Sequence, residues 1–312
     1  MRIVFFGSGN FAVPILKFLL ENNEDVVAVV TQADKRAGRG LCLKPTAIKE
    51  FTLKSSIPAD LYQPSSIKDP DFIGRIKKLS PDIFIVVSYG DLIGKDLLDI
   101  PAVMPLNIHS SLLPKYRGAA PINWAIINGD KETGITIFKM NSALDKGDII
   151  LQKRCSIEHD LDVCGLEQKL SGISIQALEQ ALFKIKSGNF PLYPQKGPGC
   201  YAPRLKKEDG FINWNCSAQE IYNRIRGLRP WPSAYTYLDF KIFKILSAEI
   251  DESDYPGAVS SEVIRLGKSG LIVKCGQHAL RLNKVQLEGG KAMGIGDFLR
   301  GHNIKSGCKL GA

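Results

Sequence analysis

The first half of the chain alternates short apolar runs with segments of helical periodicity. RIVFF (2–6), DVVAVVT (25–31) and DIFIVVS (82–88) are almost wholly apolar, as expected of strands buried on both faces. Between them, FAVPILKFLL and residues 70–78 repeat their apolar positions with the period of a helix. This alternation predicts an α/β fold, with a Rossmann-like, mostly parallel sheet covered by helices on both faces. Ligands of such sheets bind beyond the carboxyl ends of the strands.

The pattern changes after a helix predicted at about 163–186. Residues 187–206 contain four prolines and three glycines, a composition typical of a linker between domains. Beyond it, a short helix near 217–227 precedes several β-patterned runs, which predict a small antiparallel β-barrel (OB-like) or sandwich. We therefore expect a first domain at 1–187, a linker at 188–206 and a second domain at 207–312.

Composition and charge narrow the class of protein. Hydrophobic content of 44% and charged content of 23% are ordinary for a globular protein. The net charge of +9 is uneven, since residues 201–312 hold 17 Lys and Arg against 11 Asp and Glu. A polyanionic partner such as a nucleic acid would suit this charge, and a solvated basic surface is the alternative.

Cysteine usage and hydropathy indicate a cytoplasmic, soluble protein. The seven cysteines are scattered and include no C-x-x-C pair, which argues against a disulfide framework or a zinc ribbon. The apolar N-terminus is interrupted by glycines and a proline, unlike a signal peptide, and no run reaches the roughly 18 apolar residues of a membrane span. We expect no membrane association.

The N-terminal GSGNFA (7–12) follows a strand, opens a helix and fits the dinucleotide pattern G-x-G-x-x-A. The second strand, however, ends in VVTQ, with no acidic residue at its tip to bind a ribose hydroxyl. A tight turn that feeds the first helix is therefore favoured over a nucleotide loop.

The segment NIHSSLLPKYRG (107–118) turns polar where a buried strand would stay apolar. Strand residues two apart share a face, so Asn107 and His109 point the same way and Ile108 points into the core. An imidazole can move a proton near neutral pH, and an amide can donate a hydrogen bond to an oxyanion. With Asp145 in the later loop NSALDKGD, these groups suit acyl transfer to an amine.

Other chemistry has less support. None of the four histidines has the spacing of a zinc motif, so we expect no metal, and the serines after His109 lie outside any nucleophile elbow. The alternatives for the site itself are a hydrogen-bonded core histidine and an aspartate that serves only the turn before Gly147.

At these residues the chain resembles a known family. NIHSSLLPKYRGAAPINWAIINGD and GITIFKMNSALDKGDII resemble the folate-dependent formyltransferases. Segments 31–40, 204–214, 224–235 and 289–301 resemble the members that act on initiator Met-tRNA, so the likeness covers nearly the whole length. It implies 10-formyltetrahydrofolate as the donor and the α-amino group of methionine on initiator Met-tRNA as the acceptor, with Asn107, His109 and Asp145 as the catalytic set.

The resemblance also implies binding residues. In the family, the segment Ser111, Leu112, Leu113 and Pro114 lies at the folate, and a loop corresponding to 34–49 contacts the tRNA acceptor stem. That loop carries the basic residues Lys35, Arg36, Arg39 and Lys44, and the C-terminal barrel is expected to bind tRNA as well.

Departures from the family pattern are few. Ser8-Gly9 replaces Thr-Pro, Lys35-Arg36 stand where a proline is usual, and Asn213 replaces an acid. The first explains why a turn looks like a nucleotide loop, and the second leaves the path of the 34–49 loop open. An amino sugar nucleotide as acceptor, and a folate- or nucleotide-binding module without catalysis, are the alternative functions.

Overall fold

The computed structural model describes residues 1–37, 42–55, 57, 59–267 and 270–311. They form two compact units, each assembled from separate stretches of the chain. The first contains Met1–Pro121, Glu132–Ser156 and Glu167–Ala202, and the second contains Ile122–Lys131, Ile157–Leu166 and Pro203–Ala312. The division drawn from the sequence, with a linker at 188–206, stays a prediction.

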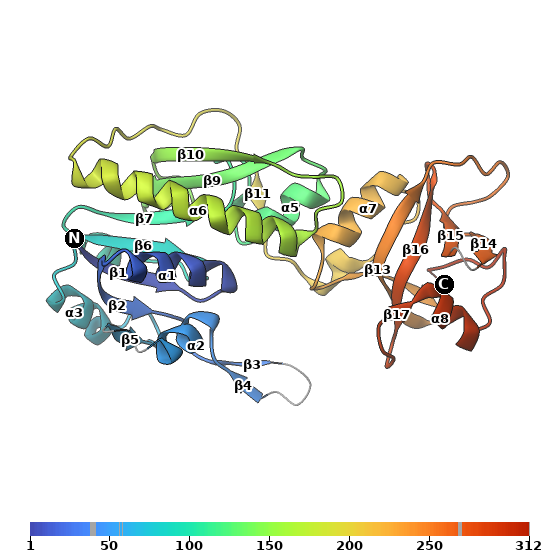
Figure 1. Cartoon of the computed structure of the whole chain (residues 1–312), viewed down its shortest axis with the longest axis horizontal. Helices are drawn as coiled ribbons and strands as arrows, with labels where there is room; N and C mark the ends of the chain where they lie inside the picture. Colours follow the sequence, from blue (N-terminus) through green and yellow to red (C-terminus); the bar gives the residue numbers. More distant parts are fainter. Residues whose placement is uncertain (38–41, 56, 58, 268–269, 312) are drawn as a thin grey trace. The chain divides into compact units, whose positions relative to one another are not determined.

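The first unit is built on a seven-stranded sheet with the order β10-β9-β7-β6-β1-β2-β5 (Figure 1). Neighbouring strands from β5 through β2, β1 and β6 to β7 pair in parallel, whereas β9 is antiparallel to β7 and β10 is antiparallel to β9. The mostly parallel sheet predicted from the sequence is confirmed. Its strands are β1 (Arg2–Gly7), β2 (Asp25–Val30), β5 (Asp60–Tyr62), β6 (Ile83–Val87), β7 (Met104–His109), β9 (Glu132–Lys139) and β10 (Ile149–Ser156).

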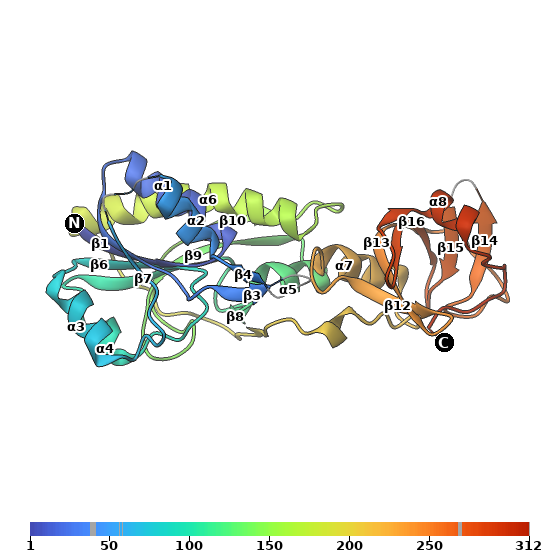
Figure 2. The ribbon, with the colours of Figure 1, turned by 90° about the horizontal axis from the view of Figure 1, so that it is seen from below.

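Helices cover both faces of this sheet. Figure 2 shows α1, α2 and α6 along one side and α3 and α4 along the other. On the second side, Phe72 of α3 and Leu97 of α4 pack with Phe6 and Phe84 of the sheet, and all four side chains are buried. The helical segments are η1 (Asn10–Ala12), α1 (Val13–Glu21), α2 (Ala47–Lys54), α3 (Pro70–Lys78), α4 (Lys95–Leu98) and α6 (Val163–Lys186).

Two small two-stranded sheets complete the first unit. β3 (Lys35–Ala37) and β4 (Cys42–Lys44) form an antiparallel hairpin after β2. β8 (Arg117–Gly118) pairs in parallel with β11 (Tyr201–Ala202), from a much later part of the chain.

The second unit contains an antiparallel sheet with the order β12-β13-β16-β15-β14, to which β17 adds beside β16. Its core includes Phe243, Leu271 and Leu282 from the sheet and Phe298 from the last helix. Among the described residues the pairing does not return from β14 to β12, so the antiparallel sheet is confirmed and its closure into a barrel stays a prediction. The elements are α5 (Pro121–Ile127), η2 (Lys207–Gly210), α7 (Ala218–Gly227), β12 (Ala234–Leu238), β13 (Lys241–Asp251), β14 (Val263–Gly267), β15 (Gly270–Lys274), β16 (Ala279–Leu287), β17 (Met293–Gly294) and α8 (Ile295–Gly301).

Helix α7 forms hydrogen bonds with both of the earlier segments that belong to the second unit. At its C-terminal end, Gly227 O accepts a 2.8 Å hydrogen bond from Asn123 Nδ2. The guanidinium of Arg226, also on α7, donates to the carbonyl oxygens of Glu158 (3.2 Å) and Leu161 (2.8 Å). These bonds anchor 122–131 and 157–166 to the C-terminal part of the chain.

Candidate active site

Strand β7 places Asn107 and His109 on one face of the sheet. Asn107 pairs with Phe138 and His109 with Thr136, both on the antiparallel neighbour β9. Ile108, between them, is buried. The Asn107 side chain is half-buried, and its carboxamide forms no hydrogen bond with any described residue. Its donors are therefore available to a substrate.

His109 is held by a backbone carbonyl. Its Nε2 lies 2.9 Å from Tyr116 O. Because a carbonyl oxygen only accepts hydrogen bonds, Nε2 must carry a hydrogen, and the neutral ring then has its lone pair on Nδ1. Nδ1 is therefore the nitrogen that gains and loses a proton.

Asp145 faces that nitrogen. Its Oδ2 lies 3.8 Å from His109 Nδ1, and the two side chains are only 9% and 8% exposed. The same oxygen accepts a 2.7 Å hydrogen bond from Gly118 N. Asp145 has φ = 50°, in the left-handed region that aspartate and asparagine enter more readily than most residues. The structure thus brings two of the three expected catalytic groups together at a largely buried position.

The segment 111–114, expected at the folate, is bonded to the hydroxyl of Thr136 on strand β9. Thr136 Oγ1 donates to Ser111 O (2.6 Å) and accepts from Leu113 N (3.1 Å). Ser111 and Leu113 are buried, whereas Leu112 and Pro114 are partly exposed. Leu112 and Pro114 therefore supply the side-chain surface that a ligand could contact in this segment.

The N-terminal turn uses its own amides. Ser8 N and Gly9 N both donate to Ser88 O, at 3.2 and 3.4 Å. Ser8 Oγ accepts a hydrogen bond from Gln32 N (3.0 Å). A Cβ on Gly7 would lie 2.9 Å from that of Ala12, so this glycine permits close packing of the turn. The amides that would bind a pyrophosphate are already bonded, which agrees with a tight turn.

The β3–β4 hairpin carries most of the expected tRNA residues. Lys35, Arg36 and Lys44 are exposed, and Lys35 stands directly opposite Lys44 in the pairing register. Arg39 lies outside the described residues. Asp34, which directly precedes β3, forms a 2.8 Å ion pair with Lys49. Hydrogen bonds, first from Gln63 and then from Lys49, hold the pKa of the Asp34 carboxyl below its ordinary value.

Two side chains that the sequence did not single out hold the loop of Asp145. Gln195 Nε2 donates to Asp145 O (2.8 Å) and Gly147 O (2.9 Å). Its Oε1 accepts from both Nε (3.1 Å) and a terminal nitrogen (2.6 Å) of Arg117. Gln195 lies in the segment whose composition predicts a linker, and no signal in the sequence indicates these contacts.

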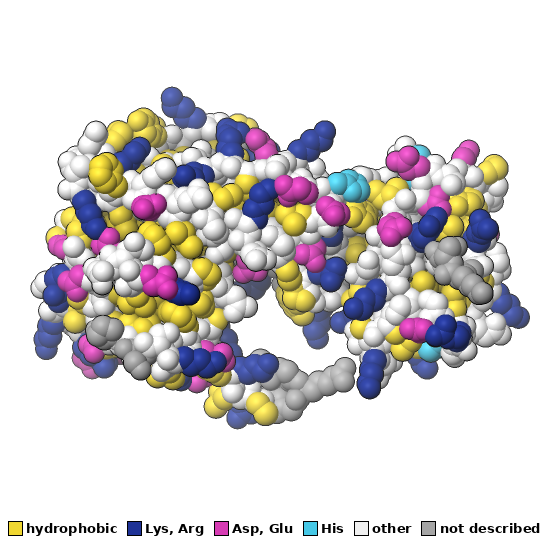
Figure 3. Space-filling view, viewed as in Figure 1, with side chains coloured by type: hydrophobic (Ala, Val, Ile, Leu, Met, Phe, Trp, Pro, Cys, Tyr) yellow, Lys and Arg dark blue, Asp and Glu magenta, His cyan; other side chains and the backbone are white. Residues whose placement is uncertain are grey.

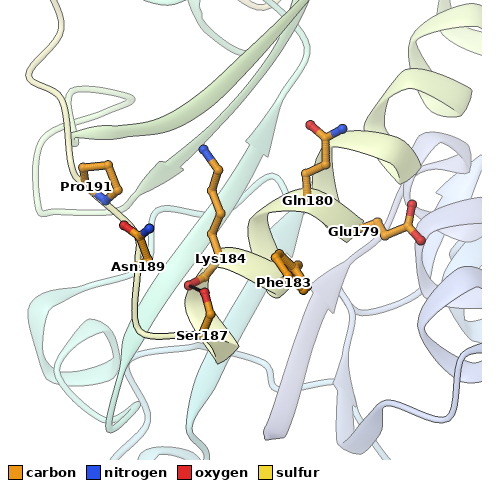
Figure 4. A pocket seen from close by; sticks show the side chains of 7 residues that line it. All are labelled: Glu179, Gln180, Phe183, Lys184, Ser187, Asn189 and Pro191. Carbon is orange, nitrogen blue, oxygen red and sulfur yellow. Dashed lines mark hydrogen bonds between the residues drawn. The ribbon is translucent and has the colours of Figure 1, made fainter.

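Cavities and surface charge add little to this site. A pocket of about 610 Å³ lies at the C-terminal end of α6 (Figure 4) and shares no lining residue with the Asn107–His109–Asp145 group. On the face drawn in Figure 3, Lys and Arg side chains are spread widely, with Asp and Glu among them. Across the described ranges, no cluster of three His, Cys, Asp or Glu could hold a metal ion, and no helix is long and apolar enough to span a membrane.

Comparison with known proteins covers the whole chain. Residues 1–182 match the formyl transferase family, and residues 204–303 match the formyl transferase C-terminal domain. The methionyl-tRNA formyltransferase of Caldanaerobacter subterraneus subsp. tengcongensis is 46% identical, over 99% of this chain and 100% of that protein. The enzyme of the same name from Pelotomaculum thermopropionicum is 43% identical, over 100% of this chain and 99% of that protein.

Solved structures share the fold at low identity. An N-formyltransferase from Helicobacter canadensis, in complex with folinic acid and dTDP-3-aminofucose, superposes with a TM-score of 0.65 at 17% identity, over 90% of this chain and 99% of that one. HypX from Aquifex aeolicus, in complex with tetrahydrofolic acid, gives 0.64 at 17% identity, over 99% of this chain and 50% of that one. The full-length sequence matches decide the assignment: this chain is a formyl-transferring enzyme and belongs to the methionyl-tRNA formyltransferase family.

Proposed function

We propose that this enzyme transfers the formyl group of 10-formyltetrahydrofolate to the α-amino group of methionine on initiator Met-tRNA, for translation initiation. The observation that carries the proposal is the nearly buried His109–Asp145 pair, with the free Asn107 amide on the same strand face as His109. An amine, a proton acceptor and an oxyanion donor are what formyl transfer to nitrogen needs.

The reaction assigns one task to each residue. The amine nitrogen attacks the formyl carbon, and the carbonyl oxygen becomes an oxyanion that the Asn107 amide stabilises by donating a hydrogen bond. His109 moves the proton that the amine loses towards the leaving folate nitrogen, through Nδ1. Asp145 lies where the positive charge of the imidazolium develops, and Tyr116 O fixes the ring.

The same proposal assigns the residues that bind the folate and the tRNA. Residues 111–114 line the folate site, with Leu112 and Pro114 as contacts. The hairpin with Lys35, Arg36 and Lys44, together with Arg39, binds the tRNA acceptor end. The C-terminal domain, placed at 207–312 by the sequence, contributes further contacts with phosphates.

The direct test offers the enzyme two acceptors. Purified protein is mixed with 10-formyltetrahydrofolate and either Met-tRNA or a dTDP-linked amino sugar, and the formylated product is identified by mass. We expect formyl-Met-tRNA only. Formylation of the sugar alone would support the alternative acceptor, and no product with either would support a binding module without catalysis.

Replacing Asn107 by Ala is expected to lower kcat by about 10² to 10³-fold, the usual effect of losing an oxyanion donor. Asn107→Asp should be at least as damaging, because it keeps the shape but places a negative charge beside the oxyanion. Steady-state kinetics of both variants, with melting temperatures to verify folding, test this. Activity retained in Asn107→Asp would refute the donor role.

Binding of Met-tRNA should depend strongly on salt. The logarithm of the affinity should fall linearly with the logarithm of salt concentration, with a slope of roughly −0.7 to −0.9 per phosphate contacted. Lys35 and Lys44 repel each other across the hairpin, and a bound phosphate would relieve that repulsion. Lys44→Gln should therefore weaken binding and reduce the slope by about one contact.

The matched control for the hairpin is Lys78→Gln, which removes the same charge from an exposed position at the end of α3. Filter binding or fluorescence anisotropy over a salt series measures both variants. Equal, small effects of the two substitutions would mean that the hairpin is not a specific tRNA contact.

A further inference from the structure

Residues 193–202, called here the strap, bond to residues 116–118 and to the loop that contains Asp145. At the start of the strap, Tyr193 exchanges two backbone hydrogen bonds with Ile149 of β10, at 2.7 and 2.9 Å. At its end, Tyr201 and Ala202 form β11, which pairs in parallel with Arg117 and Gly118. The strap is therefore tied to the chain that follows His109 and to the strand that follows Asp145.

The strap holds the backbone atoms that anchor the catalytic pair. Tyr116 O is the acceptor for His109, and Gly118 N is the donor to Asp145. Both belong to the stretch 116–118, which the strap bonds directly: Cys200 O accepts from Arg117 N (2.9 Å), and Cys200 Sγ accepts from Tyr116 N (3.2 Å). Both catalytic side chains are therefore bonded to backbone atoms of a stretch that pairs with the strap.

Gln195 connects the strap to the Asp145 loop through its side chain. Its amide nitrogen bridges the carbonyl oxygens of Asp145 and Gly147, and its oxygen receives the guanidinium of Arg117. Arg117 Nε also donates to Asp145 O, at 3.2 Å. Both polar atoms of Gln195 are used, and all its partners are within two residues of Asp145 or belong to β8.

We propose that Gln195 is a positioning residue for formyl transfer, which fixes the backbone of the Asp145 loop so that the carboxylate meets Gly118 N and faces His109 Nδ1. Its hydrogen bonds reach the backbone of the Asp145 loop and the side chain of Arg117, and none of them reaches a catalytic side chain, so Gln195 acts through the position of the Asp145 carboxylate. This inference rests on the proposed function, since its measure is the formylation of Met-tRNA.

The first test replaces the amide by an apolar chain of similar length. Gln195→Met should lower kcat by about 10- to 100-fold, because a displacement of about 1 Å in a catalytic group can cost on the order of 10²-fold. The KM for the formyl donor should change little. Lys196→Met is the matched control, because Lys196 is the exposed neighbour on the strap, and it should keep wild-type kinetics.

A second variant separates the two halves of the Gln195 amide. Gln195→Glu keeps an oxygen for Arg117 but removes the donor to the Asp145 and Gly147 carbonyls. Since that donor reaches the catalytic loop, kcat should fall about as far as in Gln195→Met. Wild-type kcat in Gln195→Glu would overturn the assignment.

A double-mutant cycle shows whether Gln195 acts through Asp145. In the Asp145→Asn background, Gln195→Met should cost less than about 2-fold in kcat, because the charge that Gln195 positions is already gone. Multiplicative effects of the two substitutions would overturn the proposal and indicate a general structural role. If the wild-type enzyme formylates Met-tRNA and Gln195→Met is equally active, this inference is overturned and the proposed function stands. If the wild-type enzyme does not formylate Met-tRNA, the proposed function itself is overturned.

Discussion

His109→Gln is expected to lower kcat by about 10² to 10⁴-fold, the usual contribution of general acid–base catalysis. Glutamine places an amide nitrogen near the position of Nε2, so it can still donate to Tyr116 O and fill most of the buried site. What it lacks is a ring nitrogen that can accept a proton from the amine and pass it on. Single-turnover rates of formyl-Met-tRNA formation measure the effect without interference from product release.

The control is His278→Gln, an exposed histidine in the turn before β16. It should keep wild-type turnover, and both variants should melt close to the wild-type temperature. If His109→Gln also kept near-wild-type turnover, the imidazole would be a core histidine satisfied by Tyr116 O, and His109 would not carry the proton.

The sheet could be predicted because each of its central strands is covered on both sides. Burial on both faces makes residues 3–6 and 83–87 apolar at every position, and this pattern can be read from the sequence without knowing which strands lie beside them. The same logic placed Asn107 and His109 on one face, because polar residues two apart at the end of such a strand stand out.

The strap could not be predicted, because its residues form no continuous apolar run or periodic pattern. β8 and β11 are two residues long each, so no periodicity marks them, and they are separated by more than 80 positions in the chain. The prolines and glycines of the strap give the composition of a free linker. Its order comes from hydrogen bonds to distant partners, which local sequence does not encode.

Residues 234–246 contain a turn that their sequence does not indicate. AYTYLDFKIFKIL reads as continuous, yet β12 ends at Leu238 and β13 begins at Lys241. Asp239 and Phe240 both have positive φ, 48° and 61°. Such turns usually contain Asn-Gly or Asp-Gly, and a phenylalanine in that position hides the hairpin from sequence reasoning.

Asp145→Asn is expected to lower kcat by about 10² to 10⁴-fold, nearly as much as losing the imidazole. Asparagine keeps the volume of the side chain and readily adopts the left-handed backbone found at this position, with φ = 50°. Its amide oxygen can still accept the hydrogen bond from Gly118 N. The substitution therefore removes one property, the negative charge that faces His109 Nδ1 at 3.8 Å.

The comparison with Asp145→Glu completes this test, because glutamate keeps the charge and moves it by one methylene. We expect Asp145→Glu to be impaired but to retain more activity than Asp145→Asn, while both fold normally by circular dichroism and melting temperature. An aspartate that only shapes the turn before Gly147 would give the opposite order, since asparagine suits a left-handed turn and the longer glutamate does not. Full activity of Asp145→Asn would show that the negative charge is not needed, and His109 would then move the proton without an acidic partner.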